Sequence, residues 1–428
     1  MNILLTGANG FIGRYLFANL TTAGHNVIPA IRHRNETDDR LSQGRSIAID
    51  FNRDTRPEDW MPRLAGIDAV INCAGILQKR IGQSIEAIHA DAPKALFTAC
   101  QNAGVKRVIQ ISAISAEEGA GTAYASTKRV ADSFLTSTEL EWVILRPSLI
   151  YAAGASGGTA LFRALAALPF VIPVIGKGEQ PFQPIYIDDL SATVLRILDL
   201  PAIRRVIIDP VGPEIITLRQ LLIDLRRWLG LPPGRIIEIP ISLVRIAALM
   251  GNILGGPINS TAIQQLVFGN AGNSAKFIET TDIQPRRWSD VLSAHPSQVQ
   301  DHWHARLYFL RPILRWALAL MWMVSGIVGL GRPPGITSQA FAAFGLSGVA
   351  ASAVIWASCL FDIGISALLL IRWRPRWIAL IQIAVVSAYT IELTYAEPSL
   401  WTDPFGPLLK NIPIVIAILI LGAIESDR

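Results

Sequence analysis

The first thirteen residues, Met1–Gly13, read MNILLTGANGFIG and decide the fold of the N-terminal part of the chain. A short apolar run is followed by glycines at three-residue intervals, Gly7, Gly10 and Gly13. Between a strand and a helix, these glycines would allow a tight turn, a close backbone approach to a pyrophosphate and close helix–strand packing. The free amides that open the helix would hold the phosphates. The stretch therefore predicts a dinucleotide-binding turn; three glycines in an ordinary turn is the alternative.

Apolar runs and helical stretches alternate from this turn to about residue 150. The predicted strands are Asn2–Thr6, Asn26–Ile31, Ser46–Asp50, Ala69–Cys73, Arg107–Ser112 and Trp142–Leu145, and the predicted helices include Gly13–Ala23, Ala92–Ala103 and Ala125–Ser137. Because continuous apolar strands alternate with helices, we expect an α/β fold, a Rossmann-type doubly wound parallel sheet, over residues 1–150. Residues 151–300 are more irregular and rich in Pro and Gly, which indicates a small second lobe.

Beyond residue 306 the sequence becomes strongly apolar. The four longest apolar segments are Ile313–Leu330, Gly348–Ile371, Trp377–Tyr395 and Leu408–Ile424. Each approaches the roughly 20 residues that a helix needs to cross a hydrocarbon core. We therefore expect an all-α bundle of four transmembrane helices over residues 306–428. Buried helices of a large soluble domain are the alternative.

Composition and charge limit the class of protein. Half of the chain is apolar (51%), only 17% is charged, and the formal net charge is +5. No run of Lys and Arg suggests nucleic acid, and three cysteines without a CxxC pair fit a reducing compartment. No secretory signal peptide is expected. Arginines before the first apolar segment and the RWRPR loop at 372–376 place the N-terminal domain and the C-terminus in the cytoplasm, at a bacterial-type inner membrane.

The second predicted strand indicates which nucleotide is bound. It ends without the carboxylate that would accept from the ribose 2′-hydroxyl of NAD, and Arg32 and Arg34 stand there instead. An Arg can pair with a 2′-phosphate, which favours NADP(H) over NAD(H); a solvated basic loop is the alternative. Asp50 could accept from the adenine amino group. The candidate cofactor-binding residues are Thr6, Gly7, Asn9, Gly10, Phe11, Ile12, Gly13, Arg32, Arg34, Asp50, Cys73, Ala74, Gly75, Tyr124, Lys128 and Pro147.

The segment YASTK at 124–128 supplies candidate catalytic groups. On a helix, Tyr124 and Lys128 lie on one face, and a lysine ammonium beside a phenol can lower its pKa. Such a tyrosine can exchange a proton with a substrate hydroxyl or carbonyl while hydride passes to or from a nicotinamide. Ser112, which ends the fifth predicted strand, could hold the substrate oxygen. The candidate catalytic residues are therefore Ser112, Tyr124 and Lys128; an ordinary exposed helix face is the alternative.

Taken together, these motifs resemble the extended or atypical short-chain dehydrogenase/reductases of the NAD-dependent epimerase/dehydratase type. The resemblance covers roughly residues 1–300 and is greatest for the branch related to an accessory subunit of respiratory complex I. It rests on TGANGFIG (6–13), NCAG (72–75), ISA (111–113), YASTK (124–128), RPSLIY (146–151) and PIYIDDL (184–190). It implies that Arg146 and Pro147 begin the region that closes over the nicotinamide and that Asp188 or Asp189 braces the second lobe.

Two positions depart from the pattern of that family. Ala113 stands where the family's active serine or threonine often lies, with Ser115 as a nearby substitute. The helix that often carries an active-site asparagine has His89 near that place, and a packed or capping histidine is the alternative.

The C-terminal quarter resembles the DoxX-like four-helix membrane family in LALMWMVSGIVGL (318–330), FDIGISALLLI (361–371) and FGPLLKNIPIVIAILIL (405–421). Ionisable residues inside membrane segments usually face the bundle interior and find partners. We hypothesise that Asp362, Glu392 and Lys410 frame a polar site for a quinone head group or a proton, with the last two paired; a lock between helices is the alternative. The apolar stretch 238–258 could rest at the headgroup region and guide an oily substrate, or simply pack in the second lobe.

These observations predict a membrane-anchored NAD(P)H-dependent oxidoreductase of the short-chain dehydrogenase type. Its substrate would be a lipophilic carbonyl, alcohol or quinone-like molecule, and Tyr124 would be the acid/base. A non-catalytic NADP(H)-binding assembly or sensor protein of a membrane complex is the second hypothesis, and a sugar-nucleotide epimerase or dehydratase is the third. The expected partners are the lipid bilayer and a lipophilic small molecule, without nucleic acid.

Overall fold

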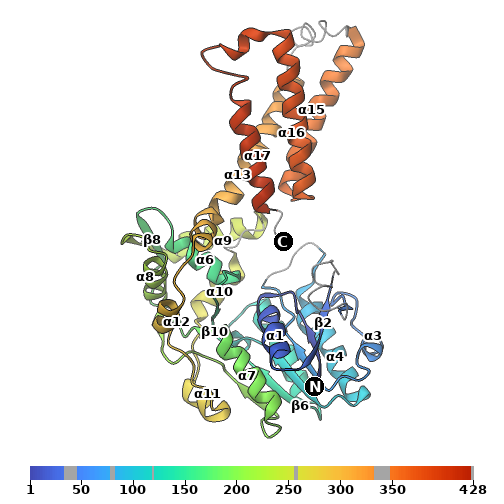
Figure 1. The fold of residues 1–428 in the computed structure, drawn as a ribbon, viewed down its shortest axis with the longest axis vertical. Coiled ribbons are helices and arrows are strands. Elements are labelled where there is room, and N and C mark those ends of the chain that lie inside the picture. The colour runs from blue at the N-terminus through green and yellow to red at the C-terminus, as the bar shows by residue number, and fades with distance from the viewer. Residues whose placement is uncertain (33–45, 78–81, 118–119, 255–258, 332–347, 426–428) are drawn as a thin grey trace. The chain divides into compact units, whose positions relative to one another are not determined.

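The structure is a computed structural model that describes residues 1–32, 46–77, 82–117, 120–254, 259–331 and 348–425. The chain divides into two compact units, Met1–Ala305 and Arg306–Arg428. Figure 1 shows an α/β unit with a parallel sheet and a unit made of long helices. We call them the nucleotide unit and the membrane unit and describe each by itself.

A seven-stranded parallel sheet forms the centre of the nucleotide unit, in the order β11-β6-β5-β4-β1-β2-β3. Its strands are β1 (Asn2–Thr6), β2 (Asn26–Ile31), β3 (Ile47–Ala48), β4 (Ala69–Asn72), β5 (Arg107–Ile111), β6 (Glu141–Leu145) and β11 (Val206–Ile208). Every residue of β4 and β5 is buried, as expected for strands that are covered on both faces. This confirms the predicted Rossmann-type fold.

Helices cover both faces of the sheet. On one face lie α1 (Phe11–Thr22) and α7 (Ile187–Asp199), and on the other lie α3 (Pro57–Trp60), α4 (Ala92–Ala103) and α5 (Ala123–Thr136). Alternate strand residues point to opposite faces, so Ile3 and Leu5 join the core under α1 and α7 whereas Leu4 joins the core under α4 and α5. Figure 1 shows α1 and α7 side by side in front of the sheet.

Two strands differ from the sequence prediction. β3 is shorter than the predicted Ser46–Asp50, because the amide of Asp50 donates to Asp54 Oδ2 at 2.7 Å and a turn follows. β11 extends the sheet from within residues 151–300, a stretch that we had assigned to the second lobe as a whole. The division near residue 150 remains a prediction, and the sheet draws its last strand from beyond it.

The second lobe consists of short strand pairs and helices. Its strand pairs are β7 (Ile150–Tyr151) with β10 (Ile185–Tyr186), β8 (Val171–Ile175) with β13 (Arg235–Ile239), and β9 (Pro181–Phe182) with β12 (Ile216–Thr217). Its helices are α6 (Gly157–Ala166), α8 (Leu218–Trp228), α9 (Ile241–Leu254), α10 (Ser260–Phe268), α11 (Ser274–Thr281) and α12 (Trp288–Ala294). Asp189 braces this lobe through its carboxylate, which accepts from the amide and Nε of Arg286 at 2.9 and 2.8 Å.

The described residues of the membrane unit form helices joined by turns. Its helices are α13 (Val299–Gly331, which begins in the first unit), α15 (Gly348–Leu370), α16 (Pro375–Ala396), the short η4 (Pro398–Trp401) and α17 (Asn411–Glu425). Among the described residues, three helices are long and apolar enough to cross a membrane. The fourth, α17, has 15 residues and spans about 22 Å, less than the roughly 30 Å of a hydrocarbon core.

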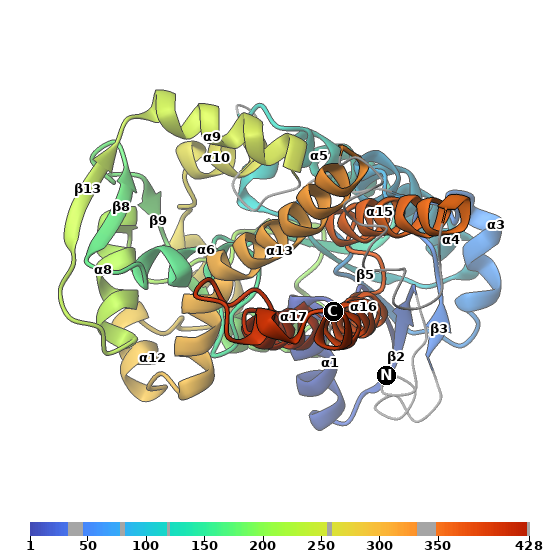
Figure 2. The same cartoon turned by 90° about the horizontal axis from the view of Figure 1, so that it is seen from above.

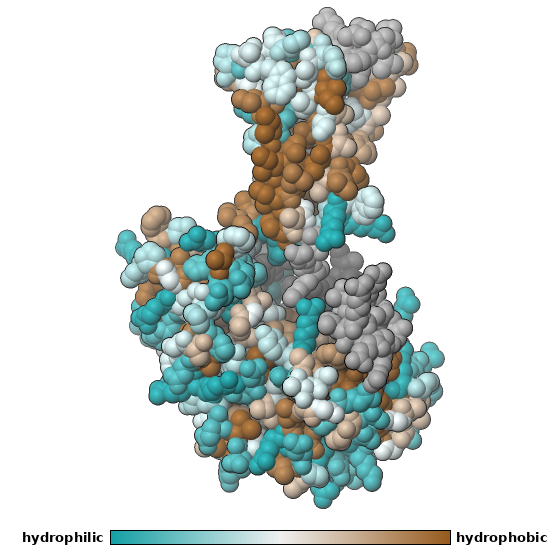
Figure 3. Space-filling view, in the orientation of Figure 1, coloured by the Kyte–Doolittle hydropathy of each residue, from teal (hydrophilic) through white to brown (hydrophobic). Residues whose placement is uncertain are grey.

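Three of the four predicted membrane-crossing helices are long enough to span a hydrocarbon core, and the fourth, α17, is shorter than predicted. Residues 408–410 form a turn instead of the first turn of α17. In Figure 3 the visible face of this unit has a broad apolar band. Exposed apolar residues of the unit include Leu320, Leu380 and Ile416. An apolar outer surface of this kind fits contact with lipid tails.

Polar contacts inside the membrane unit differ from those expected. Arg315 of α13 forms a buried ion pair with Glu425 of α17, with Nε donating to Oε1 at 2.6 Å. Asp362 accepts from the hydroxyls of Ser325 and Tyr389 at 2.8 and 3.3 Å. In the part of the chain that the structure describes, no ion pair joins Glu392 to Lys410, so that predicted pair is not formed. Asp362 remains a buried polar centre among α13, α15 and α16.

Candidate cofactor and catalytic site

The glycine turn has the geometry that the sequence predicts. Gly7 has φ +67°, and a Cβ there would lie 2.8 Å from the carbonyl carbon of Cys73 at the end of β4. A Cβ on Gly13 would overlap the carbonyl oxygen of Gly7. The amide of Gly10 donates to that same oxygen at 2.9 Å, and α1 begins at Phe11. The turn thus needs glycine, and it leaves the first amides of α1 beside the ends of β1 and β4.

A buried chain of side chains joins three strand ends beneath this turn. Thr6 Oγ1 donates to Asn72 Oδ1 at 2.5 Å, and Asn72 Nδ2 donates to Gln110 Oε1 at 2.7 Å. Asn72 Oδ1 also accepts from the amide of Ala74 at 3.2 Å, which fixes the backbone that follows β4. Neither Asn72 nor Gln110 was among the candidate site residues, although Asn72 begins the NCAG motif. Polar residues at the carboxyl ends of neighbouring apolar strands were the available signal.

A pocket of about 200 Å³ opens along the carboxyl ends of β1 to β4. The candidate cofactor-binding residues that line it are Gly7, Asn9, Gly10, Arg32, Asp50, Ala74 and Gly75. Ile31, Phe51 and Ile76 add apolar wall. Thr6, Phe11, Ile12, Gly13 and Cys73 are not among its lining residues; they belong to the turn, the helix and the strand ends around it. A phosphate-binding turn beside an apolar slot is what the adenosine end of a dinucleotide requires.

The two charged residues of this pocket have different surroundings. Arg32 is exposed and its guanidinium faces the side-chain amide of Gln83, whose oxygen, when turned toward it, accepts at 2.7 Å. Asp50 accepts from the amide and Nδ2 of Asn52 at 3.0 and 3.1 Å. Arg34 lies outside the described residues.

The helix α5 carries two of the three catalytic candidates, Tyr124 and Lys128, and Lys128 lies against the Ala74–Gly75 backbone. Lys128 is buried, and its Nζ donates to the carbonyl oxygens of Ala74 at 3.2 Å and Ile111 at 2.9 Å. A Cβ on Gly75 would lie 3.3 Å from this Nζ. Lys128 therefore links the backbone that lines the cofactor pocket to the end of β5. Burial lowers the pKa of the ammonium, although the nearby Asp132 opposes that shift.

Tyr124 is half-buried one turn before the lysine. Burial, and next the charge of Asp132, raise the pKa of its phenol to about 12. The expectation that Lys128 lowers the pKa of this phenol is thus not met, because the ammonium is held by two backbone carbonyls instead. At neutral pH the phenol is protonated and is a proton donor.

Ser112 points its hydroxyl to α5. Its Oγ donates to Asp132 Oδ2 at 2.5 Å, and both side chains are buried. Burial raises the pKa of Asp132 to about 6, although the bond from Ser112 favours the carboxylate. Within the described ranges, no hydrogen bond joins Ser112 to Tyr124. Ser115, the possible substitute, is buried in the short helix η3 (Ile114–Ala116), and Pro147 accepts from the amide of Ile114 at 3.2 Å.

His89 is a buried contact between the cofactor pocket and the tyrosine. Its Nε2 accepts from the amide of Ile76 at 3.0 Å, so Nδ1 carries the proton and faces Thr127 Oγ1 at 3.0 Å. Its ring lies 5.3 Å from that of Tyr124, edge to face. Burial, and next the charge of Lys128, lower its pKa to about 2, so the ring is neutral. A one-turn π-helix, η2 (Ala87–Asp91), places this histidine, which sequence spacing could not foresee.

Comparison with known proteins supports both halves of the chain. Residues 7–165 match the NAD(P)H-binding family and residues 319–419 match the DoxX-like family. A ceramide reductase from Caulobacter vibrioides is 25% identical over 239 residues, which cover 56% of this chain and 73% of the relative. Subunit 9 of the NADH dehydrogenase [ubiquinone] 1 alpha subcomplex from Arabidopsis thaliana is 26% identical over 253 residues, covering 56% of this chain and 61% of the relative.

Solved structures show the same fold. MoeE5 in complex with UDP-glucose and NAD has a TM-score of 0.53 and 19% identity, over 70% of this chain and 98% of its own. The dTDP-glucose 4,6-dehydratase from Bacillus anthracis, in complex with NAD, has a TM-score of 0.55 and 14% identity, over 70% and 96%. The chain therefore combines an NAD(P)-binding Rossmann domain, related to reductases and epimerases, with a C-terminal DoxX-like membrane domain.

Proposed function

We propose that this protein is a membrane-anchored oxidoreductase that uses NADP(H) to interconvert a carbonyl and an alcohol on a lipophilic substrate. One observation carries the proposal: the ammonium of Lys128 binds the carbonyl of Ala74, in the wall of the cofactor pocket, from the helix that also bears Tyr124. Lys128 thus connects the backbone of the nucleotide pocket to the helix that bears the proposed proton donor. The ceramide reductase among the relatives supports a lipophilic substrate.

The residues of this chain have separate roles in the proposed reaction. When bound, NADPH supplies the hydride to the carbonyl carbon. Tyr124 gives its phenolic proton to the carbonyl oxygen, so a carbonyl, NADPH and one proton yield an alcohol and NADP⁺. Lys128 binds the carbonyls of Ala74 and Ile111 and so holds α5, which bears Tyr124, against the wall of the cofactor pocket, and solvent returns the proton to the phenolate. Because the pKa of Tyr124 is about 12, the phenol holds its proton at neutral pH, which favours the reductive direction.

Cofactor choice and orientation belong to the same proposal. Arg32 at the pocket would pair with the 2′-phosphate of NADP(H). The arginine-rich loop between α15 and α16 would lie in the cytoplasm together with the nucleotide unit, at a bacterial-type inner membrane.

Turnover by the full-length protein in detergent tests the proposal. Oxidation of NADPH is followed with long-chain aldehydes, ketones and quinones, and nucleotide affinity is measured separately. Tyr124→Phe should lower kcat by about 10²- to 10⁴-fold, the usual contribution of a positioned proton donor, and leave the Kd for NADPH unchanged. Tyr395→Phe, at an exposed tyrosine, is the matched control. Equal turnover by Tyr124→Phe and the wild type would reject the catalytic role.

A non-catalytic, NADP(H)-binding protein of a membrane complex is the second candidate. Two contacts favour it, because they occupy groups that catalysis would need. The Ser112 hydroxyl donates to Asp132, and the Lys128 ammonium donates to a backbone carbonyl. The relatives named as a complex I subunit and as the photosystem II assembly factor Ycf39 agree with it. Tight NADPH binding with no oxidation on any carbonyl or quinone of the panel would favour this function.

A further inference from the structure

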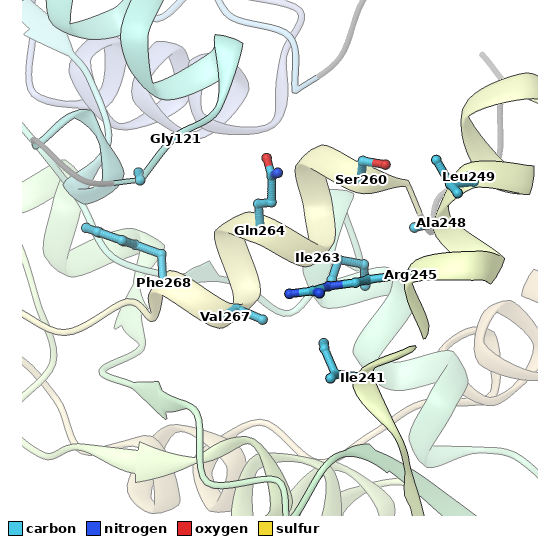
Figure 4. Close-up of a pocket in the computed structure, with 11 residues that line it drawn as sticks. Gly121, Ile241, Arg245, Ala248, Leu249, Ser260, Ile263, Gln264, Val267 and Phe268 are labelled. Atoms are coloured by element: carbon cyan, nitrogen blue, oxygen red, sulfur yellow. The ribbon is translucent and has the colours of Figure 1, made fainter. Parts of the chain in front are cut away.

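A second pocket, of about 620 Å³, lies in the nucleotide unit between α9, α10 and the loop that precedes α5. Figure 4 shows the side chains that face it, and Figure 2 shows α9 and α10 running side by side. Its volume is within the range of small-molecule sites in proteins.

The walls of this pocket are mainly apolar. Ile241 and Leu249 of α9 face Ile263, Val267 and Phe268 of α10 across it. Leu249 and Val267 are more than half exposed, at 59% and 53%, although each lines the pocket. Exposed aliphatic side chains around a cavity are costly in water unless an apolar ligand covers them. The pocket therefore suits an alkyl chain.

One cation crosses this apolar pocket. The side chain of Arg245 extends from α9 between Ile241 and Ile263 (Figure 4). Within the residues that the structure describes, no carboxylate oxygen lies within 4.0 Å of its guanidinium. Five N–H donors are thus available to an oxygen-rich head group. The combination of alkyl walls and a guanidinium fits an amphiphile better than a pure hydrocarbon.

One end of the pocket borders the N-terminus of α5, the helix that bears Tyr124. Ala120 and Gly121 line it directly before Thr122, the residue that caps α5 two positions ahead of Tyr124. Gln265 of α10 donates from Nε2 to Thr122 Oγ1 at 2.7 Å. This bond fixes the wall of the pocket to the first turn of α5. The pocket therefore borders the first turn of the helix that carries the proposed proton donor.

We propose that this pocket, the chain groove, holds the alkyl chain of a lipid substrate and presents its carbonyl to Tyr124, with Arg245 binding polar oxygens of the head group. The proposal rests on the proposed function and names its substrate class. A protein with membrane-spanning helices is held where such lipids are concentrated. Two more exposed residues of α9, Leu243 and Ile246, extend the apolar surface beyond the groove.

Photolabelling tests occupancy without any need for turnover. The full-length protein in lipid nanodiscs is irradiated with a hexadecanal analogue that carries a diazirine at its chain end, and labelled peptides are mapped by mass spectrometry. Label is expected on the peptides of α9 and α10, and excess hexadecanal should displace it. Val267→Trp fills part of the groove from an exposed position. It should lower the labelling by about tenfold, which is the loss in affinity expected when roughly two methylene groups of the ligand are no longer buried.

Matched controls separate the possible outcomes. Ile215→Trp changes a similarly exposed residue that does not line the groove and should leave labelling unchanged. Labelling that Val267→Trp leaves unchanged, or labelling of the membrane helices alone, would contradict the proposal that the chain groove binds an alkyl chain. Groove labelling with no NADPH oxidation would instead reject the proposed function and retain a lipid site.

Kinetics add a second readout if the protein turns over aldehydes. Val267→Trp should raise the KM for hexadecanal by about tenfold and leave the KM for butanal unchanged, because the short chain does not reach the filled part. An equal rise for both aldehydes would show general damage to the site and contradict the proposal.

Discussion

Two buried sites, one in each unit of this protein, hold their charges in opposite ways. In the nucleotide unit, the ammonium of Lys128 is held by the backbone carbonyls of Ala74 and Ile111, and Asp132 is held by a serine hydroxyl. In the membrane unit, Arg315 and Glu425 neutralise each other directly. A paired charge is a structural contact, whereas a charge held only by dipoles is free to respond to a proton or a ligand. The two sites should therefore respond differently when one of their residues is replaced.

The glycine turn gives the largest expected effect. Gly13→Ala would force its Cβ onto the carbonyl oxygen of Gly7 and shift α1 away from the strand ends. We expect nucleotide binding to be lost and the free energy of unfolding to fall by about 3 kcal/mol or more. Tryptophan fluorescence with added NADPH and thermal unfolding would measure both.

The matched control is another helical glycine. Gly158 of α6 has open space around its Cβ position, so Gly158→Ala should stabilise the helix by about 0.5–1 kcal/mol and leave NADPH binding intact. If both variants bind NADPH as the wild type does, the turn does not hold the pyrophosphate.

The ion pair of the membrane unit should be stabilising only as a pair. Arg315→Met leaves the Glu425 carboxylate buried without its partner, which costs about 3–5 kcal/mol. The double variant Arg315→Met/Glu425→Leu removes both charges and should recover most of that loss. Hydrogen exchange of α13 and α17 in the detergent-solubilised full chain would measure it. Faster exchange in the double variant than in the single one would contradict a purely structural pair.

Two buried titratable groups of the nucleotide unit, His89 and Asp132, predict an unusual pH dependence. The pKa of His89 is lowered to about 2, so below about pH 6.5 only the unfolded chain takes up its proton, and stability falls as the pH falls. The pKa of Asp132 is raised to about 6, so between about pH 6 and pH 4 the folded chain takes up its proton first, and stability rises as the pH falls. The two contributions, each about 1.4 kcal/mol per pH unit, oppose each other in that window.

Single substitutions should separate these contributions. Relative to the wild type, His89→Gln should gain stability between about pH 6 and pH 4, and Asp132→Asn should lose it. Melting temperatures of the full chain at a series of pH values would show the two difference curves diverging. Parallel curves would mean that neither group carries the assigned shift.

Local patterns in the sequence predicted most of the nucleotide unit. The glycine spacing fixed the turn because its constraints act within eight residues, and α4 begins and ends at the predicted residues, Ala92 and Ala103. β11 escaped prediction because only three residues form it and the second lobe intervenes. The direction of Lys128 also escaped prediction. The spacing places Lys128 on the same helix face as Tyr124. Its ammonium, however, binds the carbonyl oxygens of Ala74, just after β4, and Ile111, at the end of β5.

The membrane unit shows the complementary limit. Sequence position gives the depth of a residue in a segment, but each residue turns the helix by about 100°. Glu392 and Lys410 share a predicted depth and form no ion pair in the described part of the chain, whereas Arg315 and Glu425 meet from segments that the sequence did not connect. Which charged residues pair between helices depends on how each helix is rotated about its own axis. The apolar composition of a segment does not determine that rotation.

Cofactor choice gives the smallest expected effect, because Arg32 is exposed. Arg32→Gln should weaken NADPH by about tenfold and leave NADH nearly unchanged, since a charge-assisted contact to the 2′-phosphate is lost. Arg235→Gln removes the same charge from an exposed residue of β13 that does not line the pocket, and it should change the ratio of the two Kd values little. The preference of the wild type should also shrink as salt rises, because an exposed ion pair is screened. If Arg32→Gln leaves the ratio of the Kd values for NADPH and NADH unchanged, the support for NADP(H) is lost. A cation at this strand end is the group that would bind the 2′-phosphate and so distinguish the two nucleotides.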